Sequence, residues 1–247
     1  MSTSVVVEEH DDHVVLRLTR PEVKNAIDQE MVDRLHEACT LLERTPRVAI
    51  LAGSDGVFAA GADIAQLRER RREDALRGIN SGIFDRIRRL PMPTIALLDG
   101  YALGGGAELA YACDFRIGTP RVKIGNPEAG LGILAAAGAT WRLRELVGEP
   151  LAKELLLTGR ILDATEAHAV RLLNEVVEPD ELEAAGQRWA GRIARQAPLA
   201  VRLAKSVFHA PPEAHPFVDD MAQAVLFETQ DKYDRMTAFL ERRKEKG

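Results

Sequence analysis

The chain has 247 residues, of which 46% are hydrophobic and 29% charged, and its formal net charge is -5. These proportions are those of a soluble globular protein with a sizeable core, and they exclude a disordered or fibrous chain. The acidic balance argues against a general nucleic-acid surface. The two cysteines, Cys39 and Cys113, are too few for a disulfide framework and are not spaced as metal ligands, which favours a reducing compartment.

The N-terminus is polar and acidic, unlike a secretory signal peptide. The longest uncharged run, 129–141, is rich in glycine and alanine and too short to cross a membrane. The six histidines are scattered, with none at metal-ligand spacing from another. We therefore expect a cytoplasmic protein without a membrane partner or a metal site.

The first part of the chain alternates short apolar strands with helices. The pattern predicts a hairpin of two strands, at 5–7 and 14–18, around a polar turn. Asp28 is suited to cap a helix whose apolar positions keep helical spacing up to Pro46. A buried strand at 48–51 follows. This order of strand, helix and strand predicts a parallel crossover.

A turn of small residues, FAAGADI at 58–64, comes next. Residues 60–62 are able to place main-chain N–H groups around a ligand. A simple capped turn is the alternative, and the turn alone favours it, because Asp63 and Gln66 have capping-box-like spacing. The charged run 68–77 predicts a solvated helix or a mobile loop, and a further helix at 79–90 stops before two prolines.

The stretch that organises the chain is GYALGGGAELAYA at 100–112, which follows a buried strand at 94–98. Three consecutive glycines let a ligand atom touch main-chain N–H groups. The helix that begins there adds unpaired N–H groups and the positive end of its dipole, so 104–106 suit a developing negative charge. Glu108 leans back over this turn. The alternative is a turn that only permits close packing, with Glu108 as an ordinary first-turn carboxylate.

A second carboxylate, Glu128, lies in the apolar loop GNPEAGLGI at 125–133, after short strands at 114–118 and 122–124. Burial without a cationic partner would raise its pKa toward the range useful for proton transfer. An exposed loop glutamate is the alternative, and only pairing with Glu108 makes the acid/base interpretation preferable. Beyond residue 140 one strand is expected, at 175–177. The remaining predicted elements are helices at 141–147, 151–157, 165–172, 181–195, 199–208, 217–228 and 233–243.

Five motifs resemble, in the same order, those of the enoyl-CoA hydratase/isomerase family, the crotonases. They are RPEVKNAID, FAAGADI, DGYALGGGAELAYACD, NPEAGLG and MTAFLERRK. The resemblance implies an α/β fold, the crotonase (ClpP-like) spiral of strand-strand-helix turns, over residues 1–195. A helical C-terminal trimerisation region would occupy 196–247. Acyl-CoA thioester substrates, trimers or dimers of trimers, and no metal or redox cofactor are also implied.

The same resemblance assigns roles within the site. The thioester carbonyl would lie between the N–H groups of Ala62 and Gly105, and Glu108 and Glu128 match the family's two hydratase glutamates. The remaining CoA-binding positions carry over to Val23, Lys24, Ala60, Phe239 and Arg242. The last two, near the C-terminus, would act across a subunit boundary and give the basic tail 235–246 a role beyond that of a solvated helix end.

Because both glutamates are present, the resemblance favours an enoyl-CoA hydratase of fatty-acid β-oxidation type, which adds water to a trans-2-enoyl-CoA to give a 3-hydroxyacyl-CoA. An isomerase, a thioester hydrolase or a non-catalytic RNA-binding relative are the alternatives; the glutamate pair and the acidic charge weigh against the last.

Two departures from the family pattern concern the substrate site. The segment AAAGATWRL at 135–143 replaces the common Pro-Gly-x-Gly-Gly-Thr-Gln-Arg-Leu beside the acyl pocket, and Ala65 stands where a CoA-binding lysine is frequent.

Overall fold

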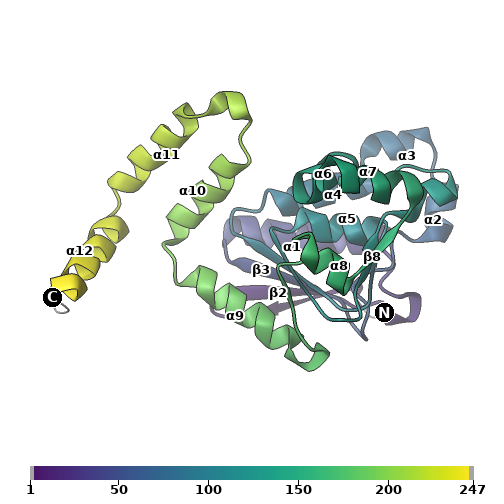
Figure 1. Ribbon diagram of the computed structural model, residues 1–247, viewed down its shortest axis with the longest axis horizontal. Helices are drawn as coiled ribbons and strands as arrows, with labels where there is room; N and C mark the ends of the chain where they lie inside the picture. Colours follow the sequence, from purple (N-terminus) through teal and green to yellow (C-terminus); the bar gives the residue numbers. More distant parts are fainter. Residues whose placement is uncertain (1–2, 245–247) are drawn as a thin grey trace.

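A six-stranded sheet forms the centre of the protein, whose computed structural model describes residues 3–244 (Figure 1). Its strand order is β1-β2-β3-β4-β6-β9, and β1 pairs antiparallel with β2, as the predicted hairpin requires. The other neighbours are parallel, so each is reached through a helical crossover. The strands are β1 (Val5–Glu9), β2 (His13–Leu18), β3 (Val48–Ala52), β4 (Thr94–Leu98), β6 (Phe115–Gly118) and β9 (Glu175–Val176).

A second, three-stranded sheet has the order β5-β7-β8. Two of its strands follow a strand of the first sheet almost at once, since β5 (Tyr101–Leu103) comes after β4 and β7 (Lys123–Gly125) after β6. The third, β8 (Ile161–Asp163), pairs antiparallel with β7. A bridge between Ala59 and Ala102 joins the FAAGADI turn to β5. Successive stretches of chain thus supply a strand to each sheet and then a helix, which is the predicted spiral.

The helices follow the apolar periodicity of the sequence. They are α1 (Gln29–Arg44), α2 (Ile64–Glu69), α3 (Arg72–Arg77), α4 (Ile79–Arg88), α5 (Gly105–Ala112), α6 (Ala139–Val147), α7 (Glu149–Thr158), α8 (Ala164–Ala169), α9 (Leu182–Ala194), α10 (Pro198–Phe208), α11 (Phe217–Phe227) and α12 (Gln230–Lys244). Short 3-10 helices occur at Pro21–Val23, Pro127–Leu131, Pro179–Glu181 and Pro212–Ala214. The charged run 68–77, expected as a helix or a loop, forms the end of α2 and all of α3. The last part of the basic tail lies outside the described residues.

Two short strands, β5 and β8, were not predicted. Each has only three residues, too few for a hydrophobic period to show. Their existence depends on pairing with β7, which is remote in sequence from both. The helix expected at 165–172 ends earlier, at Ala169, and the chain then turns through Arg171, which has a positive φ of 62°.

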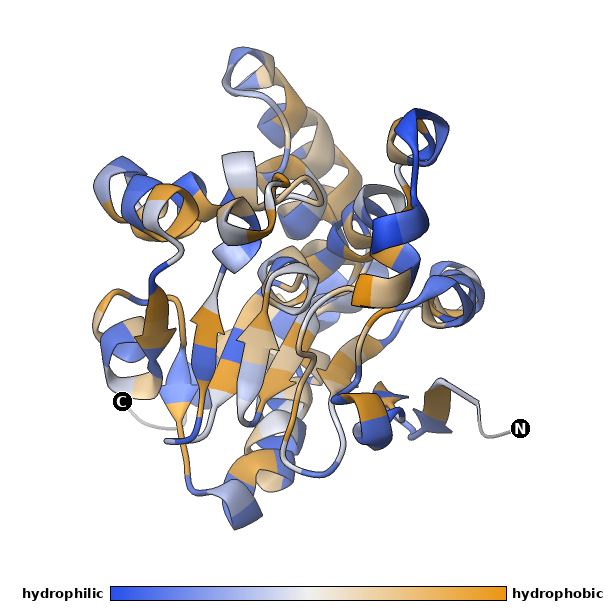
Figure 2. Ribbon diagram, turned by 90° about the vertical axis from the view of Figure 1, so that its right-hand side faces the viewer, coloured by the Kyte–Doolittle hydropathy of each residue, from blue (hydrophilic) through white to orange (hydrophobic). Residues whose placement is uncertain are grey.

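Both faces of the main sheet are buried, which explains why its parallel strands are nearly continuous apolar runs. Alternate residues of β2, β3 and β4 face a large core cluster that includes α1, α4 and α5, while the others face a smaller cluster covered by α9. The apolar segments gather on these strands in Figure 2. The first set is Leu16, Leu51 and Ala96, and the second is Val15, Ile50 and Ile95, each set paired in register.

Helix α1 shows how local sequence and packing agree. The predicted cap forms, because Asp28 Oδ1 accepts a hydrogen bond of 2.9 Å from Met31 N. Its apolar stripe, including Leu35 and Leu42, is buried. Each such side chain contributes about 1.5–3 kcal/mol on leaving water. The helix therefore buries its apolar stripe within its own chain, against the sheet and α4.

Helix α5 is buried along its whole length and carries the organising glycine turn. A Cβ added to Gly106 would lie 2.1 Å from Ala59 O, so the helix backbone sits directly against the FAAGADI turn. Only glycine permits this approach. The two turns singled out in the sequence are therefore brought together by backbone contact.

Helices α11 and α12 extend away from the sheets (Figure 1), whereas α10 remains attached to them through Lys205, whose Nζ donates to Met92 O at 3.1 Å and pairs with Asp114 at 2.7 Å. None of the described residues of these three helices is buried. This contrast with α9, which packs on the sheet, agrees with a boundary near residue 195, although the domain division stays a prediction. Within residues 3–244 no helix is both long enough and apolar enough to span a bilayer.

Candidate active site

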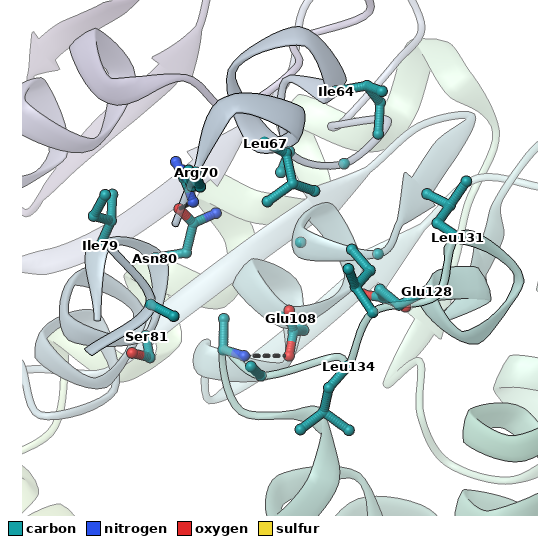
Figure 3. A pocket seen from close by; sticks show the side chains of 18 of the residues that line it. Ile64, Leu67, Arg70, Ile79, Asn80, Ser81, Glu108, Glu128, Leu131 and Leu134 are labelled. Atoms are coloured by element: carbon teal, nitrogen blue, oxygen red, sulfur yellow. Dashed lines mark hydrogen bonds between the residues drawn. The ribbon is translucent and has the colours of Figure 1, made fainter. Parts of the chain in front are cut away.

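A cavity of about 390 Å³ opens beside the glycine turn, a size typical of small-molecule sites (Figure 3). Its walls come from the FAAGADI turn, from α2, α3 and α4, from the start of α5, and from the loop 127–137. Apolar side chains such as Leu67, Leu131 and Leu134 form much of the lining. Five of the predicted site residues also line it: Ala60, Ala62, Gly105, Glu108 and Glu128.

Two backbone N–H groups meet in this cavity. Gly105 is the first residue of α5, so its N–H has no acceptor within the helix. Ile27 hydrogen-bonds to Gly61 O and Asp63 N, which leaves the intervening Ala62 N–H directed to the other side. A Cβ on Gly105 would lie 3.4 Å from Ala62 N. The two donors are therefore adjacent, as an oxyanion site requires.

Glu108 projects from α5 into the cavity and is only 4% exposed. Its Oε1 accepts hydrogen bonds from Ala137 N at 2.7 Å and from Ala139 N at 3.1 Å. Burial raises the pKa of this carboxyl to about 7, with a further increase from Glu128 and a partial offset from the two N–H donors. Near neutral pH the group is therefore able both to accept and to give a proton.

Glu128 reaches the same cavity from the 3-10 helix Pro127–Leu131 (Figure 3). Its Oε1 accepts a hydrogen bond of 3.3 Å from Asn126 Nδ2, whereas Oε2 is buried without a partner among the described residues. Burial raises its pKa. Gly104 has a φ of 51°, and a Cβ there would lie 3.2 Å from Glu128 Oε1. Glycine at 104 thus serves both the turn and the approach of the carboxylate.

The predicted CoA-binding positions near the N-terminus border the cavity. Ala60 lines it, but its N–H donates a hydrogen bond of 3.0 Å to Lys24 O. Among the N–H groups expected to face a ligand at this turn, that of Ala60 therefore already has an acceptor within the chain. Lys24 has its Nζ 5.5 Å from the centroid of the Tyr101 ring. Val23, in the 3-10 helix Pro21–Val23, is 39% exposed. Ala60 is therefore part of the lining, whereas Val23 and Lys24 are not among the lining residues.

Phe239 and Arg242 are not brought to this site within one chain. Both lie on α12, which Figure 1 shows at the opposite end of the molecule from α2 and α3. Phe239 is 62% exposed, and Arg242 Nε donates within its own helix to Ala238 O. If they contact CoA, they do so on another copy of the chain.

Several site residues were not predicted. The N–H groups of Ala137 and Ala139 hold Glu108, and they belong to the segment in which the sequence departs from the common pattern. Asn126 could have been suspected, since it stands two residues before Glu128. Asn80, whose Oδ1 accepts a 3.1 Å hydrogen bond from Arg70, lines the cavity with no signal in the sequence. Within residues 3–244, no three His, Cys, Asp or Glu side chains gather as metal ligands.

Two buried carboxylates that share a cavity with a pair of adjacent N–H donors define an acid/base site in which a carbonyl oxygen can become an oxyanion. Comparison with known proteins is consistent with this class. The chain belongs to the enoyl-CoA hydratase/isomerase family, whose model matches residues 9–246.

Full-length relatives support the assignment. The chain is 37% identical over 250 residues to the crotonyl-CoA hydratase of Syntrophomonas wolfei, a match that covers 98% of this chain and 96% of that protein. It is 35% identical to the short-chain-enoyl-CoA hydratase of Clostridium acetobutylicum, with 99% and 97% covered. The crystal structure of enoyl-CoA hydratase from Bacillus anthracis superposes with a TM-score of 0.91 at 32% identity, covering 97% and 96% of the chains. The family and fold expected from the motifs are confirmed.

Proposed function

We propose that this protein is an enoyl-CoA hydratase, which adds water across the double bond of a trans-2-enoyl-CoA to give a 3-hydroxyacyl-CoA. The observation that carries the proposal is the meeting of Glu108 and Glu128 in one cavity beside the N–H groups of Ala62 and Gly105. The same reaction is supported by the two relatives described above, which are named as a crotonyl-CoA hydratase and a short-chain-enoyl-CoA hydratase.

The N–H pair accounts for activation of the substrate. With the thioester oxygen between Ala62 N and Gly105 N, attack at C3 moves electrons from the double bond onto that oxygen. The resulting enolate is stabilised by both donors and by the positive end of the α5 dipole. Each donor of this kind is worth about 3–4 kcal/mol in the transition state.

The two carboxyl groups divide the proton transfers. Glu108, fixed through Oε1 by Ala137 and Ala139, takes a proton from water as the water oxygen bonds to C3. Glu128, the second carboxyl group of the cavity, gives a proton to C2. After the reaction Glu108 holds one proton more and Glu128 one proton fewer. Transfer of a single proton from Glu108 to Glu128 therefore returns the pair to its starting state. Two nearby carboxyl groups cannot easily both be ionised, which suits this division.

The acyl-CoA substrate supplies its own CoA, and no further cofactor is proposed. We extend the proposal to a homotrimer, or a dimer of trimers, in which Phe239 and Arg242 of a neighbouring copy complete the CoA site. The large apolar side chains left exposed on the C-terminal helices support an assembly, because single proteins rarely expose such a surface. They are Leu199, Phe208, Phe217, Met221, Val225, Phe227, Tyr233, Met236, Phe239 and Leu240.

Loss of the conjugated enoyl absorbance of crotonyl-CoA on incubation with the protein tests the proposal. We expect turnover and a 3-hydroxybutyryl-CoA product. A parallel assay with a 3-enoyl-CoA measures isomerisation. An unchanged crotonyl-CoA signal from protein that still binds CoA would remove hydration from consideration, and rapid conversion of the 3-enoyl substrate alone would assign an isomerase.

A further inference from the structure

A second cavity, of about 180 Å³, lies beyond Glu108, between α4, α5 and the segment 136–142. It shares four lining residues with the first cavity: Ser81, Glu108, Ala136 and Ala137. When the thioester lies at the N–H pair, the double bond lies beside Glu108. An acyl chain that extends beyond the double bond would therefore enter this second cavity.

One face of α4 forms a wall that runs along this cavity. Ser81, Phe84, Asp85 and Arg88 are spaced as i, i+3, i+4 and i+7 and all line it. Ser81 and Arg88 are separated by about 10 Å along the helix axis, at 1.5 Å per residue. The guanidinium of Arg88 is directed toward His209 and Trp141. It lies 4.9 Å from the centroid of the Trp141 ring, which forms the opposite wall.

Of the three arginines that line this cavity, Arg88 is the one without a direct ion pair among the described residues, although Asp85 and Glu145 are close enough to act on its charge. The two other arginines that line it are paired, Arg89 with Asp85 at 2.8 Å and Arg142 with Glu145 at 2.9 Å. Arg88 has no ion pair with a carboxylate of residues 3–244. One guanidinium nitrogen contacts His209 Nδ1 at 3.1 Å, while Nε is buried without a partner.

The surroundings make an unpaired guanidinium costly. Burial, with a contribution from Arg142, lowers the pKa of Arg88, and Glu145 and Asp85 offset part of this effect. Tyr111 lines the same cavity and has a buried hydroxyl without a partner among the described residues. A hydrocarbon tail would leave both polar groups unsatisfied, whereas a carboxylate would form a charge-assisted pair with the guanidinium.

Building on the proposed hydratase function, we infer that Arg88 is a specificity residue that selects trans-2-enoyl-CoA substrates whose acyl chain ends in a carboxylate. The chain passes Glu108 between Ser81 and Ala136, and its terminal carboxylate pairs with Arg88 against Trp141. The preferred substrates are therefore enoyl-CoA thioesters of dicarboxylic acids.

Matched substrates test this inference on the full chain. We would measure kcat/KM for trans-2-hexenoyl-CoA and trans-2-hexenedioyl-CoA, and for the corresponding eight-carbon pair, with crotonyl-CoA as a reference. In the wild type the diacid should be preferred at least tenfold at one or both lengths, the equivalent of about 1.4 kcal/mol. Arg88→Met should abolish this preference, and Arg88→Lys should retain part of it. Arg144→Met is the control, since this exposed arginine of α6 lines neither cavity.

The outcomes separate the two proposals. A wild-type protein that does not hydrate crotonyl-CoA contradicts the proposed function. One that hydrates crotonyl-CoA but turns over the monoacid thioesters at least as well as the diacids at both lengths overturns the inference about Arg88. That comparison needs no variant, so it stands even if Arg88→Met fails to fold.

Discussion

Helix α1 and the helices of the C-terminal region all carry an apolar stripe, but this stripe is buried in α1 and exposed in the C-terminal helices. Helix α1 buries Met31, Leu35 and Leu42 within its own chain, against the sheet and α4. In α11, Phe217 is 70% exposed and Met221 55%. An apolar stripe therefore shows that a helix has a partner surface, but not whether that surface belongs to the same chain. Under the proposed function, chemistry resides in the region up to α9 and assembly in α10 to α12.

The largest expected effect lies wholly in the first region. Glu108→Gln keeps the shape of the side chain and an oxygen for the N–H groups of Ala137 and Ala139, but it cannot accept a proton. Hydration of crotonyl-CoA should fall by about 100- to 10,000-fold, the usual loss for a general base. Oligomeric state should not change. Glu30→Gln, an exposed position on α1, is the matched control, and a similar loss there would point to a nonspecific cause.

Glu128→Gln should slow both hydration of a 2-enoyl-CoA and isomerisation of a 3-enoyl-CoA, because both reactions exchange the C2 proton through this carboxyl group. The loss should again be about 100-fold or more. Glu108→Gln should affect isomerisation less, since that reaction consumes no water. Normal hydration by Glu128→Gln would show that the two-glutamate assignment is wrong.

Gly105→Pro removes one of the two N–H donors. Proline is tolerated at the first position of a helix, so the fold should survive. We expect kcat to fall by about 100- to 1,000-fold, the usual cost of one oxyanion donor. Circular dichroism and light scattering must show a folded protein of unchanged size. A near-native rate in such a protein would exclude Gly105 as a donor.

The burial of Glu108 predicts a pH-dependent stability that the C-terminal region lacks. Its pKa is about 7 in the folded protein against a usual value of 4.5. The folded state binds more protons between these values, so wild-type stability falls as pH rises through that window. Glu108→Gln should increase the free energy of unfolding by up to about 3 kcal/mol at pH 8 and by little at pH 4. Urea titrations should show no such gain for Glu241→Gln, an exposed residue of α12.

Truncation before Met236 should have the smallest effect on catalysis. We expect KM for crotonyl-CoA to rise about tenfold, or about 1.4 kcal/mol, because Phe239 and Arg242 of a neighbour are lost. Assembly should weaken, while kcat changes little. Light scattering that finds a wild-type monomer at micromolar concentration would contradict the role given to these helices.

Local sequence determined much of the fold and the centre of the site. The hairpin, the Asp28 cap and the buried strands follow from residue patterns within a few positions of each other. Glu108 and the glycine turn were identified for the same reason, because the lean of a helical side chain toward its N-terminus is a property of the helix itself. The two small-residue turns and the apolar loop had offered residues 60–62, residues 104–106 and Glu128 as candidates, and the family motifs then assigned roles to Ala62, Gly105 and Glu128.

Tertiary structure decided which distant groups satisfy these residues. Ala137 and Ala139, 29 and 31 positions beyond Glu108, donate the hydrogen bonds that fix its carboxylate. The Ala60 N–H is taken by Lys24 O, and β5 and β8 exist only as partners of β7. Arg88 meets Trp141 only because α4 and the first turn of α6 enclose one cavity. A pattern encodes the conformation of its own segment, whereas the partner of a buried polar group depends on how remote segments pack.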